Sequence, residues 1–193
     1  MSQVAPTVSD MTSIETLRAF HHPTRRRMVD FLHLHGPTQV GTLARELGQQ
    51  VGSISHHLRM LERAGVVVPA PELATDGRTS WWRLEQTSVS WSVDDFAGDA
   101  AAMVAATAAE RLNIDHQLGK LAAWKRVAAK ADPAWRQAAF TTDLLALATP
   151  EELTALQEAI SEVARSWRAG IDTDDGAVRE PVFVYAHGFP TRP

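Results

Sequence analysis

Residues 38–65 constrain the fold of this chain more than any other stretch, because two short apolar-periodic segments flank a glycine there. The first segment repeats apolar residues at the spacing of one buried helical face, at Val40, Leu43, Ala44 and Leu47. The second does the same at Val51, Ile54, Leu58 and Leu61. Thr38 is placed to cap the first helix, while Gly48 and Gly65 are placed to end the two helices. The stretch therefore predicts two helices joined by a tight turn.

The second of these helices also carries a polar face. With its apolar residues buried, the residues on or near the exposed side are Gln50, Gly52, Ser53, Ser55, His56 and Arg59. An α-helix fits the major groove of B-DNA, and side chains near its N-terminus reach the base edges. Taken alone, these residues are better explained as a solvated helix face. The helix before them and the stretch after them favour DNA contact.

A hairpin is predicted directly after the second helix. Residues 66–70 (VVVPA) form a β-branched run, and residues 79–84 (TSWWRL) form a second short strand. The Asp76-Gly77 pair between them is a turn signal, and the adjacent Arg78 is placed to reach phosphate or the minor groove. Helix, turn, helix and basic-tipped hairpin together predict a winged helix-turn-helix.

Residues 14–85 resemble the ArsR-type winged-helix repressors of bacteria. The similarity is carried, in order along the chain, by LRAFHHPTRRRMVDFLHLHGP, TLARELG, SISHHLRMLERAGVV and DGRTSWWRL. The resemblance implies a double-stranded-DNA-binding regulator of transcription, and SISHHLRMLERAGVV resembles the recognition helix of that family. The arginines at the start of the HPTRRRMVDFL helix are either a solvated basic turn or, at Arg25, a phosphate contact outside the groove.

The sequence offers little support for a metal cofactor, although many relatives sense metals. The chain has no cysteine, which excludes disulfides and thiolate ligands. His33 and His35 are two residues apart on a helix and point to different faces, and the adjacent His21 and His22 have the same difficulty. His116 has no second histidine one helical turn away. We therefore expect no metal and no other cofactor.

Charge is distributed unevenly along the chain. The net charge is −4, yet residues 12–85 carry a net +2 and residues 86–193 a net −5. This asymmetry agrees with a DNA-facing N-terminal half. No secretory signal or membrane-spanning stretch is visible, so we expect a cytoplasmic protein that binds no membrane. No nucleophile elbow, phosphate-binding glycine loop or carboxylate pair stands out, so we expect no enzyme.

The predicted organisation is a loose tail over residues 1–11, a winged helix-turn-helix over 12–86, and a C-terminal region over 92–193. An alanine-rich helix is expected from Asp94 to about Lys130, and a second from Pro150 to about Ala169. Strands are expected near Phe140 and over residues 181–187. The fold class is therefore mainly α with small β elements, and the C-terminal region reads helix, strand, helix, strand.

The C-terminal region is expected to pair two chains into a homodimer, because its long helix carries too much apolar surface for one chain to leave uncovered. Its tryptophans are first explained by core and dimer packing. The alternative is a pocket for a small apolar effector, whose candidate residues are Trp124, Trp135, Phe140 and Trp167.

The sequence thus predicts a homodimeric regulator, a repressor by its resemblance, that reads DNA through Gln50, Ser53, Ser55, His56 and Arg59. The alternative is a winged-helix module that binds another protein and not DNA.

Overall fold

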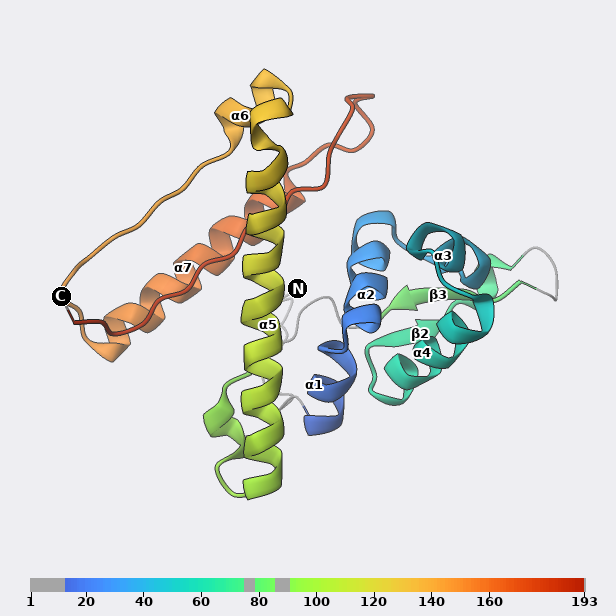
Figure 1. Cartoon of the computed structure of the whole chain (residues 1–193), viewed down its shortest axis with the longest axis horizontal. Coiled ribbons are helices and arrows are strands. Elements are labelled where there is room, and N and C mark those ends of the chain that lie inside the picture. The colour runs from blue at the N-terminus through green and yellow to red at the C-terminus, as the bar shows by residue number, and fades with distance from the viewer. Residues whose placement is uncertain (1–12, 75–78, 86–90, 193) are drawn as a thin grey trace, which may run out of the picture. The chain divides into compact units, whose positions relative to one another are not determined.

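The computed structural model describes residues 13–74, 79–85 and 91–192, and the chain divides into two compact units, Met1–Leu118 and Gly119–Pro193. The first unit begins with four helices, which are α1 (Ile14–Phe20), α2 (Pro23–His35), α3 (Val40–Leu47) and α4 (Val51–Arg63) (Figure 1). Its three strands are β1 (Thr38–Gln39), β2 (Val67–Pro69) and β3 (Trp81–Leu84). The predicted class, mainly α with small β elements, is confirmed.

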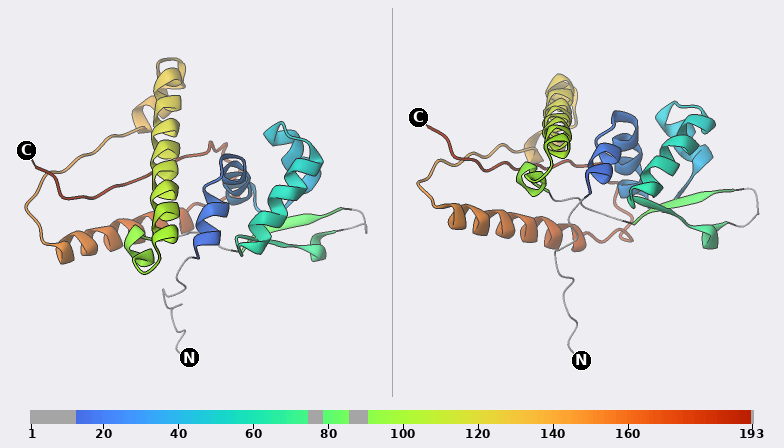
Figure 2. Two further views of the ribbon diagram at one scale, coloured as in Figure 1. Left: turned by 60° about the horizontal axis from the view of Figure 1, so that its bottom comes forward. Right: turned by 90° about the horizontal axis from the view of Figure 1, so that it is seen from below.

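The sheet is antiparallel with the order β1-β3-β2, so the predicted hairpin forms and gains a third strand. The views in Figure 2 show β2 and β3 side by side with α4 next to them. Thr38 of β1 pairs with Trp82 of β3, and the sequence did not predict the strand β1. The expectation that Thr38 caps α3 is wrong, because its hydroxyl donates to the Gly36 carbonyl at 2.9 Å and Gln39 takes the cap position.

The core of the first unit lies between α2, α3, α4 and the sheet. Its fully buried side chains include Met28, Leu43, Ile54, Leu58 and Leu61. These are the apolar positions that helical periodicity assigned to the inner faces of the three helices. Packing of the three helices against the hairpin therefore fixes the orientation of α4.

Val51 departs from the predicted pattern. It was expected to be buried, but its side chain is 55% exposed. Val51 is the first residue of α4, and side chains on a helix lean toward its N-terminus. It therefore extends past the core and lies beside the exposed polar face of α4.

The described chain from Trp91 onward packs against α1. A short 3₁₀ turn, Val93–Phe96, is capped by Ser92, and the long helix α5 (Ala100–Val127) begins after it. The expected helix start at Asp94 is therefore several residues too early. Buried alanines on α5 pack against Leu17 of α1, together with Trp91 and Phe96. As a result, the boundary between the two compact units falls after Leu118, within α5. The predicted boundary between a DNA-binding domain and a C-terminal region, at residues 86–92, stays a prediction.

The second unit contains the end of α5 and two further helices, α6 (Pro133–Ala138) and α7 (Pro150–Ala169). Asp132 accepts from the Ala134 amide at 2.7 Å, so the predicted break before Pro133 also starts α6. The strands expected near Phe140 and over residues 181–187 are wrong, since the described residues of this unit contain no strand. An alternating pattern needs a neighbouring strand to pair with, and Phe183 instead lies near the Lys120 ammonium of α5, at 5.1 Å from ring centroid to nitrogen.

Within the described residues, no helix has the length and apolar character needed to cross a membrane.

Candidate nucleic-acid interface

The turn between α3 and α4 sets the position of the recognition helix. Gly48 adopts the left-handed conformation, with φ 64° and ψ 39°, and the Gln49 amide donates to the Ala44 carbonyl at 2.9 Å. Glycine takes this conformation without the steric cost that a Cβ would bring. Only three residues therefore separate the end of α3 from the start of α4, in agreement with the tight turn that the sequence predicts.

The predicted reading face is present on α4. Gln50, His56 and Arg59 are exposed, while Ser53 and Ser55 are half-buried. The Ser55 hydroxyl donates to the Val51 carbonyl at 2.9 Å, so it offers mainly its oxygen lone pairs to a ligand. Gln50 occupies the cap position without a side-chain capping bond.

The electrostatics of this helix favour an anion at its start. The first turn of α4 contains no acidic residue. The unpaired amides of that turn form the positive end of the helix dipole. A DNA phosphate beside Gln50 would therefore meet a favourable field from the backbone alone.

The arginines of the α2 start contact helix ends within the protein. Arg25 donates to the carbonyls of Ala19 at 2.6 Å and Arg18 at 2.9 Å, at the end of α1. Arg27 donates to the Leu47 carbonyl at 3.2 Å, at the end of α3. The guanidinium groups satisfy carbonyls that a helix end leaves unpaired. This gives Arg25 a structural contact, and its phosphate contact stays a prediction.

Arg26 and its neighbours form a partly buried polar cluster between α2 and α5. Its guanidinium lies 3.5 Å from the Asp30 carboxylate and 4.6 Å from the centroid of the Phe20 ring. The His21 imidazole is buried nearby, and burial first, then the positive Arg26 and the neighbouring His116, lower its pKa to about 4. His21 is therefore neutral at pH 7.

His57 packs against the first helices, as expected from its place beside His56. Its ring centroid lies 5.0 Å from that of His22 and 5.7 Å from that of His56. Burial lowers the pKa of His57, and the charges of His22 and Arg25 add to the effect. His57 thus supports the inner side of α4, and His56 is the histidine of this pair that faces outward.

The wing is described only in part. The Asp76-Gly77 turn and Arg78 lie outside the described residues. On β3, Arg83 lies 3.3 Å from the carboxylate of Glu85 and 4.0 Å from that of Glu72. Arg83, the basic residue on the described part of the wing, is therefore paired with acidic side chains. The predicted phosphate contact of the wing then depends on Arg78.

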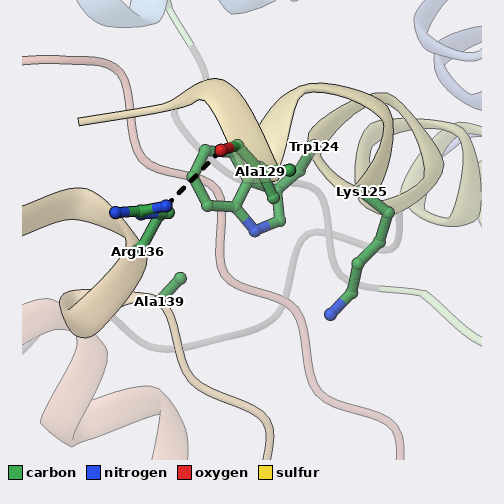
Figure 3. Close-up of a pocket in the computed structure, with 6 residues that line it drawn as sticks. Trp124, Lys125, Ala129, Arg136 and Ala139 are labelled. Atoms are coloured by element: carbon green, nitrogen blue, oxygen red, sulfur yellow. Dashed lines mark hydrogen bonds between the residues drawn. The ribbon is translucent and has the colours of Figure 1, made fainter. Parts of the chain in front are cut away.

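The four candidate pocket residues are not gathered into one site. Trp124 lines an open hollow of about 310 Å³ in the second unit, next to Lys125 and Arg136 (Figure 3). The other lining residues are Ala128, Ala129 and Ala139. Trp135, Phe140 and Trp167 do not line this hollow, and all three are exposed.

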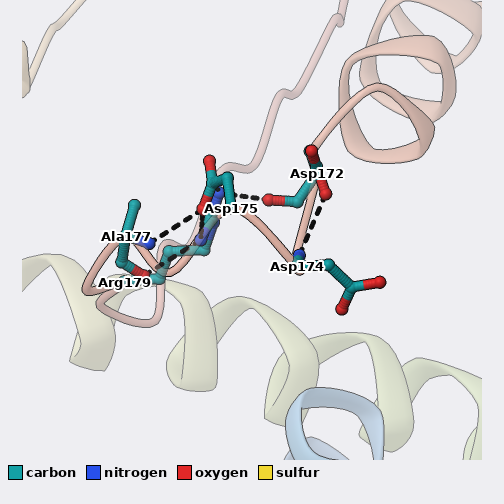
Figure 4. A network of polar contacts seen from close by, with 5 residues as sticks. All are labelled: Asp172, Asp174, Asp175, Ala177 and Arg179. Carbon is teal, nitrogen blue, oxygen red and sulfur yellow. Dashed lines mark hydrogen bonds and ion pairs between the residues drawn. The ribbon is translucent and has the colours of Figure 1, made fainter.

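A loop after α7 collects three aspartates that the sequence assigned only to a turn. The Arg179 guanidinium bonds the carboxylate of Asp175 at 2.7 Å and the backbone carbonyl of Asp172 (Figure 4). The hydrogen bonds from Arg179 and from the Ala177 amide lower the pKa of Asp175 to about 2. The carboxylates of Asp172 and Asp175 are therefore engaged by the loop's own donors. Across the parts of the chain that the structure describes, no group of three His, Cys, Asp or Glu residues could hold a metal ion.

Comparison with protein families identifies the core of the first unit. Residues 20–69, from the end of α1 through β2, match the family model described as "Helix-turn-helix domain". This segment is therefore similar to a helix-turn-helix domain. The β2–β3 hairpin after it completes the layout of a winged helix, which agrees with the predicted resemblance to ArsR-type winged-helix regulators. Such domains bind DNA in transcriptional regulators.

Solved structures similar to the chain include two whose titles name a transcriptional regulator. HlyU from Vibrio cholerae is 26% identical over 38% of this chain and 75% of its own, with a TM-score of 0.33. A "possible transcriptional regulator for arsenical resistance" is 27% identical over 61% and 97%, also with a TM-score of 0.33. An ArsR family transcriptional regulator is 23% identical over 52% and 86%, with a TM-score of 0.30. No curated protein matches the chain.

Proposed function

We propose that this chain is a sequence-specific, double-stranded-DNA-binding repressor of transcription that acts as a homodimer. The observation that carries the proposal is the acid-free start of α4, which presents Gln50, His56 and Arg59 to solvent beside the β2–β3 hairpin. A helix held this way enters the major groove with its N-terminal residues toward the bases.

Some polar residues of α4 would contact bases and so determine sequence preference, and others would contact phosphates and so position the helix. Gln50 and His56 reach base edges, and Arg59 reaches a guanine or a phosphate. Ser53 and Ser55 are half-buried and would contact DNA phosphates. The sequence analysis missed Val51, whose exposed methyl groups suit the C5-methyl of thymine.

The homodimer is supported by the surface of α5. One side of this helix buries Ala102, Ala106 and Ala109 in the first unit. Other positions leave Val104 and Leu112 exposed, and an apolar surface of this kind is stabilised by a second chain. Two chains related by a two-fold axis present two copies of α4 to half-sites about one helical turn apart. Bound over a promoter, such a dimer blocks access of the polymerase, which gives repression.

The proposal is tested by selecting bound fragments from the source genome and measuring gel shifts with the full-length chain. Arg59→Ala should weaken binding by about tenfold, the loss expected of one base or phosphate contact. Arg111→Ala is the matched control, because Arg111 is an exposed arginine on α5. Equal affinity of all three proteins removes α4 from the interface. Indifference of the wild-type chain to DNA favours the alternative, a winged-helix module that binds protein.

A further inference from the structure

The helix α7 is well terminated at both ends by its own residues. The Thr149 hydroxyl accepts from the Glu152 amide at 3.2 Å, and the Glu152 carboxylate accepts from the Thr149 amide at 2.8 Å. Pro150 occupies the first turn and Gly170 the C-terminal cap. This capping box fixes where the helix starts without any packing partner. The helix is 20 residues long, or roughly 30 Å at the standard rise.

An apolar stripe runs the length of α7. Its members recur at alternating spacings of three and four residues, and they are Leu153, Leu156, Ile160, Val163 and Trp167. This is the spacing at which two helices pack side by side along a common seam. Four of the five are open to solvent, with exposed fractions of 44% at Leu156, 44% at Ile160, 69% at Val163 and 57% at Trp167.

The first member of the stripe is in contact with another segment. A Cβ placed on Gly188 would lie 2.9 Å from a methyl carbon of Leu153, so the backbone of the C-terminal segment crosses the helix there. The remaining four residues form a continuous apolar surface. A surface of this size on a capped helix is typical of an interaction site.

We propose that α7 pairs with α7 of a second copy of this chain in antiparallel orientation, with Ile160 near the two-fold axis. This inference deepens the proposed function, since it rests on the same homodimer but assigns it a surface separate from α5.

The distribution of charge on α7 decides the partner and the direction. From Pro150 to Glu162 the helix carries four acids, Glu151, Glu152, Glu158 and Glu162, and no base. From Val163 to Ala169 it carries Arg165 and Arg168 and no acid. An antiparallel second copy places each acidic end beside the basic end of its partner, whereas a parallel copy places like charges together. The helix dipoles favour the same antiparallel arrangement.

The residues beside the stripe allow close approach. Ala159 and Ala164 flank the seam on its two sides, and neither side chain extends beyond a methyl group.

The absence of cysteine from the chain makes a clean cross-linking test possible. In the full-length protein, Ile160→Cys should form a disulfide-linked dimer under mild oxidation, because the two copies of this position face each other at the axis. Glu158→Cys is the matched control, since it lies on the opposite side of the same turn and should give about tenfold less. Equal cross-linking of both variants, or none at Ile160→Cys, overturns the antiparallel pairing.

Charge insertion gives a second, independent readout. Ile160→Lys should weaken self-association by about tenfold or more in sedimentation, while Glu158→Lys, which changes a charge on the far side of the helix, should have a much smaller effect. Because Ile160 is exposed in the single chain, both variants should keep the wild-type helical circular dichroism. Self-association that survives Ile160→Lys but is lost in Leu112→Lys assigns the dimer to α5 alone and overturns the inference.

The proposed function can fail separately from this inference. If Ile160→Cys cross-links but the wild-type chain ignores DNA, the α7 pairing stands and the regulator does not. If DNA binding and dimerisation persist in Ile160→Lys, the regulator stands and the α7 pairing does not.

Discussion

The helices α4 and α7 are both amphipathic and regular, yet the apolar face of α4 is buried and that of α7 is largely exposed. In α4 the side chains of Ile54, Leu58 and Leu61 are fully buried by neighbours from the same chain. In α7 the corresponding stripe stays largely open, with Ile160 44% exposed. The winged helix thus completes its core by itself, whereas the second unit leaves apolar surface that a second chain can cover. Under the two proposals above, the winged helix would read DNA and α7 would pair two chains.

The largest expected effect tests this contrast by truncation. Leu58→Ala should lower the free energy of unfolding by about 3 kcal/mol, because it leaves a cavity in a closed core. Ile160→Ala should cost below about 1 kcal/mol when measured at a dilution at which sedimentation gives the mass of one chain. Urea denaturation measures both. If the two variants lose the same stability under these dilute conditions, α7 is already packed within one chain and the contrast is wrong.

Acid should destabilise the first unit through His21. Burial and the neighbouring charges lower the pKa of His21 to about 4 in the folded chain. Below pH 6.5 this histidine therefore binds a proton in the unfolded chain but stays neutral in the folded chain. Stability is therefore complete above pH 6.5 and declines as the pH falls toward 4, by roughly 2 kcal/mol. Urea midpoints across this range should fall less for His21→Phe. The control is His187→Phe, a change at an exposed histidine of the second unit, and a decline that matches wild type in His21→Phe removes His21 as the cause.

Two glycines should respond to alanine with opposite signs. Gly48→Ala should cost about 1 kcal/mol, because the turn before α4 holds φ at 64°. Gly119→Ala lies inside α5, where a Cβ meets nothing within 4 Å, and should stabilise the helix by about 0.5 kcal/mol. Thermal unfolding of both variants separates them. A neutral Gly48→Ala would show that the turn between α3 and α4 is not rigid.

The smallest effect concerns the residue that the sequence analysis misplaced. Val51→Ala should reduce affinity about threefold for a site with thymine opposite the start of α4, and should leave non-specific binding unchanged. Fluorescence anisotropy with matched duplexes measures both affinities. Equal losses on both duplexes would mean that Val51 supports the fold of α4 and reads no base.

The sequence predicted those elements whose signals are local. Periodicity identified α2, α3 and α4, glycine identified the turn at Gly48, and the cap at Thr149 with Pro150 identified the start of α7. The strand β1 escaped detection because two residues carry no period and depend on Trp81 and Trp82 across the sheet. The strand near Phe140 was expected from residue type and the one over residues 181–187 from alternation, and the described residues of the second unit contain no strand for either to pair with.

The candidate site was predictable to a similar degree. The exposure of Gln50, His56 and Arg59 follows from the helical repeat. The contacts of Arg25 with the end of α1 depend on how two helices meet in space, which spacing along the chain does not encode. Whether these residues contact DNA stays a prediction.

One measurement tests the central claim most directly, namely the affinity of the full-length chain for a genomically selected duplex and a scrambled duplex at several salt concentrations. A regulator that reads DNA through α4 should bind the selected duplex at least about a thousandfold more tightly. Its log affinity should fall linearly with log salt, as phosphate contacts require. Equal affinity for the two duplexes at every salt concentration, or no binding to either, would contradict the account.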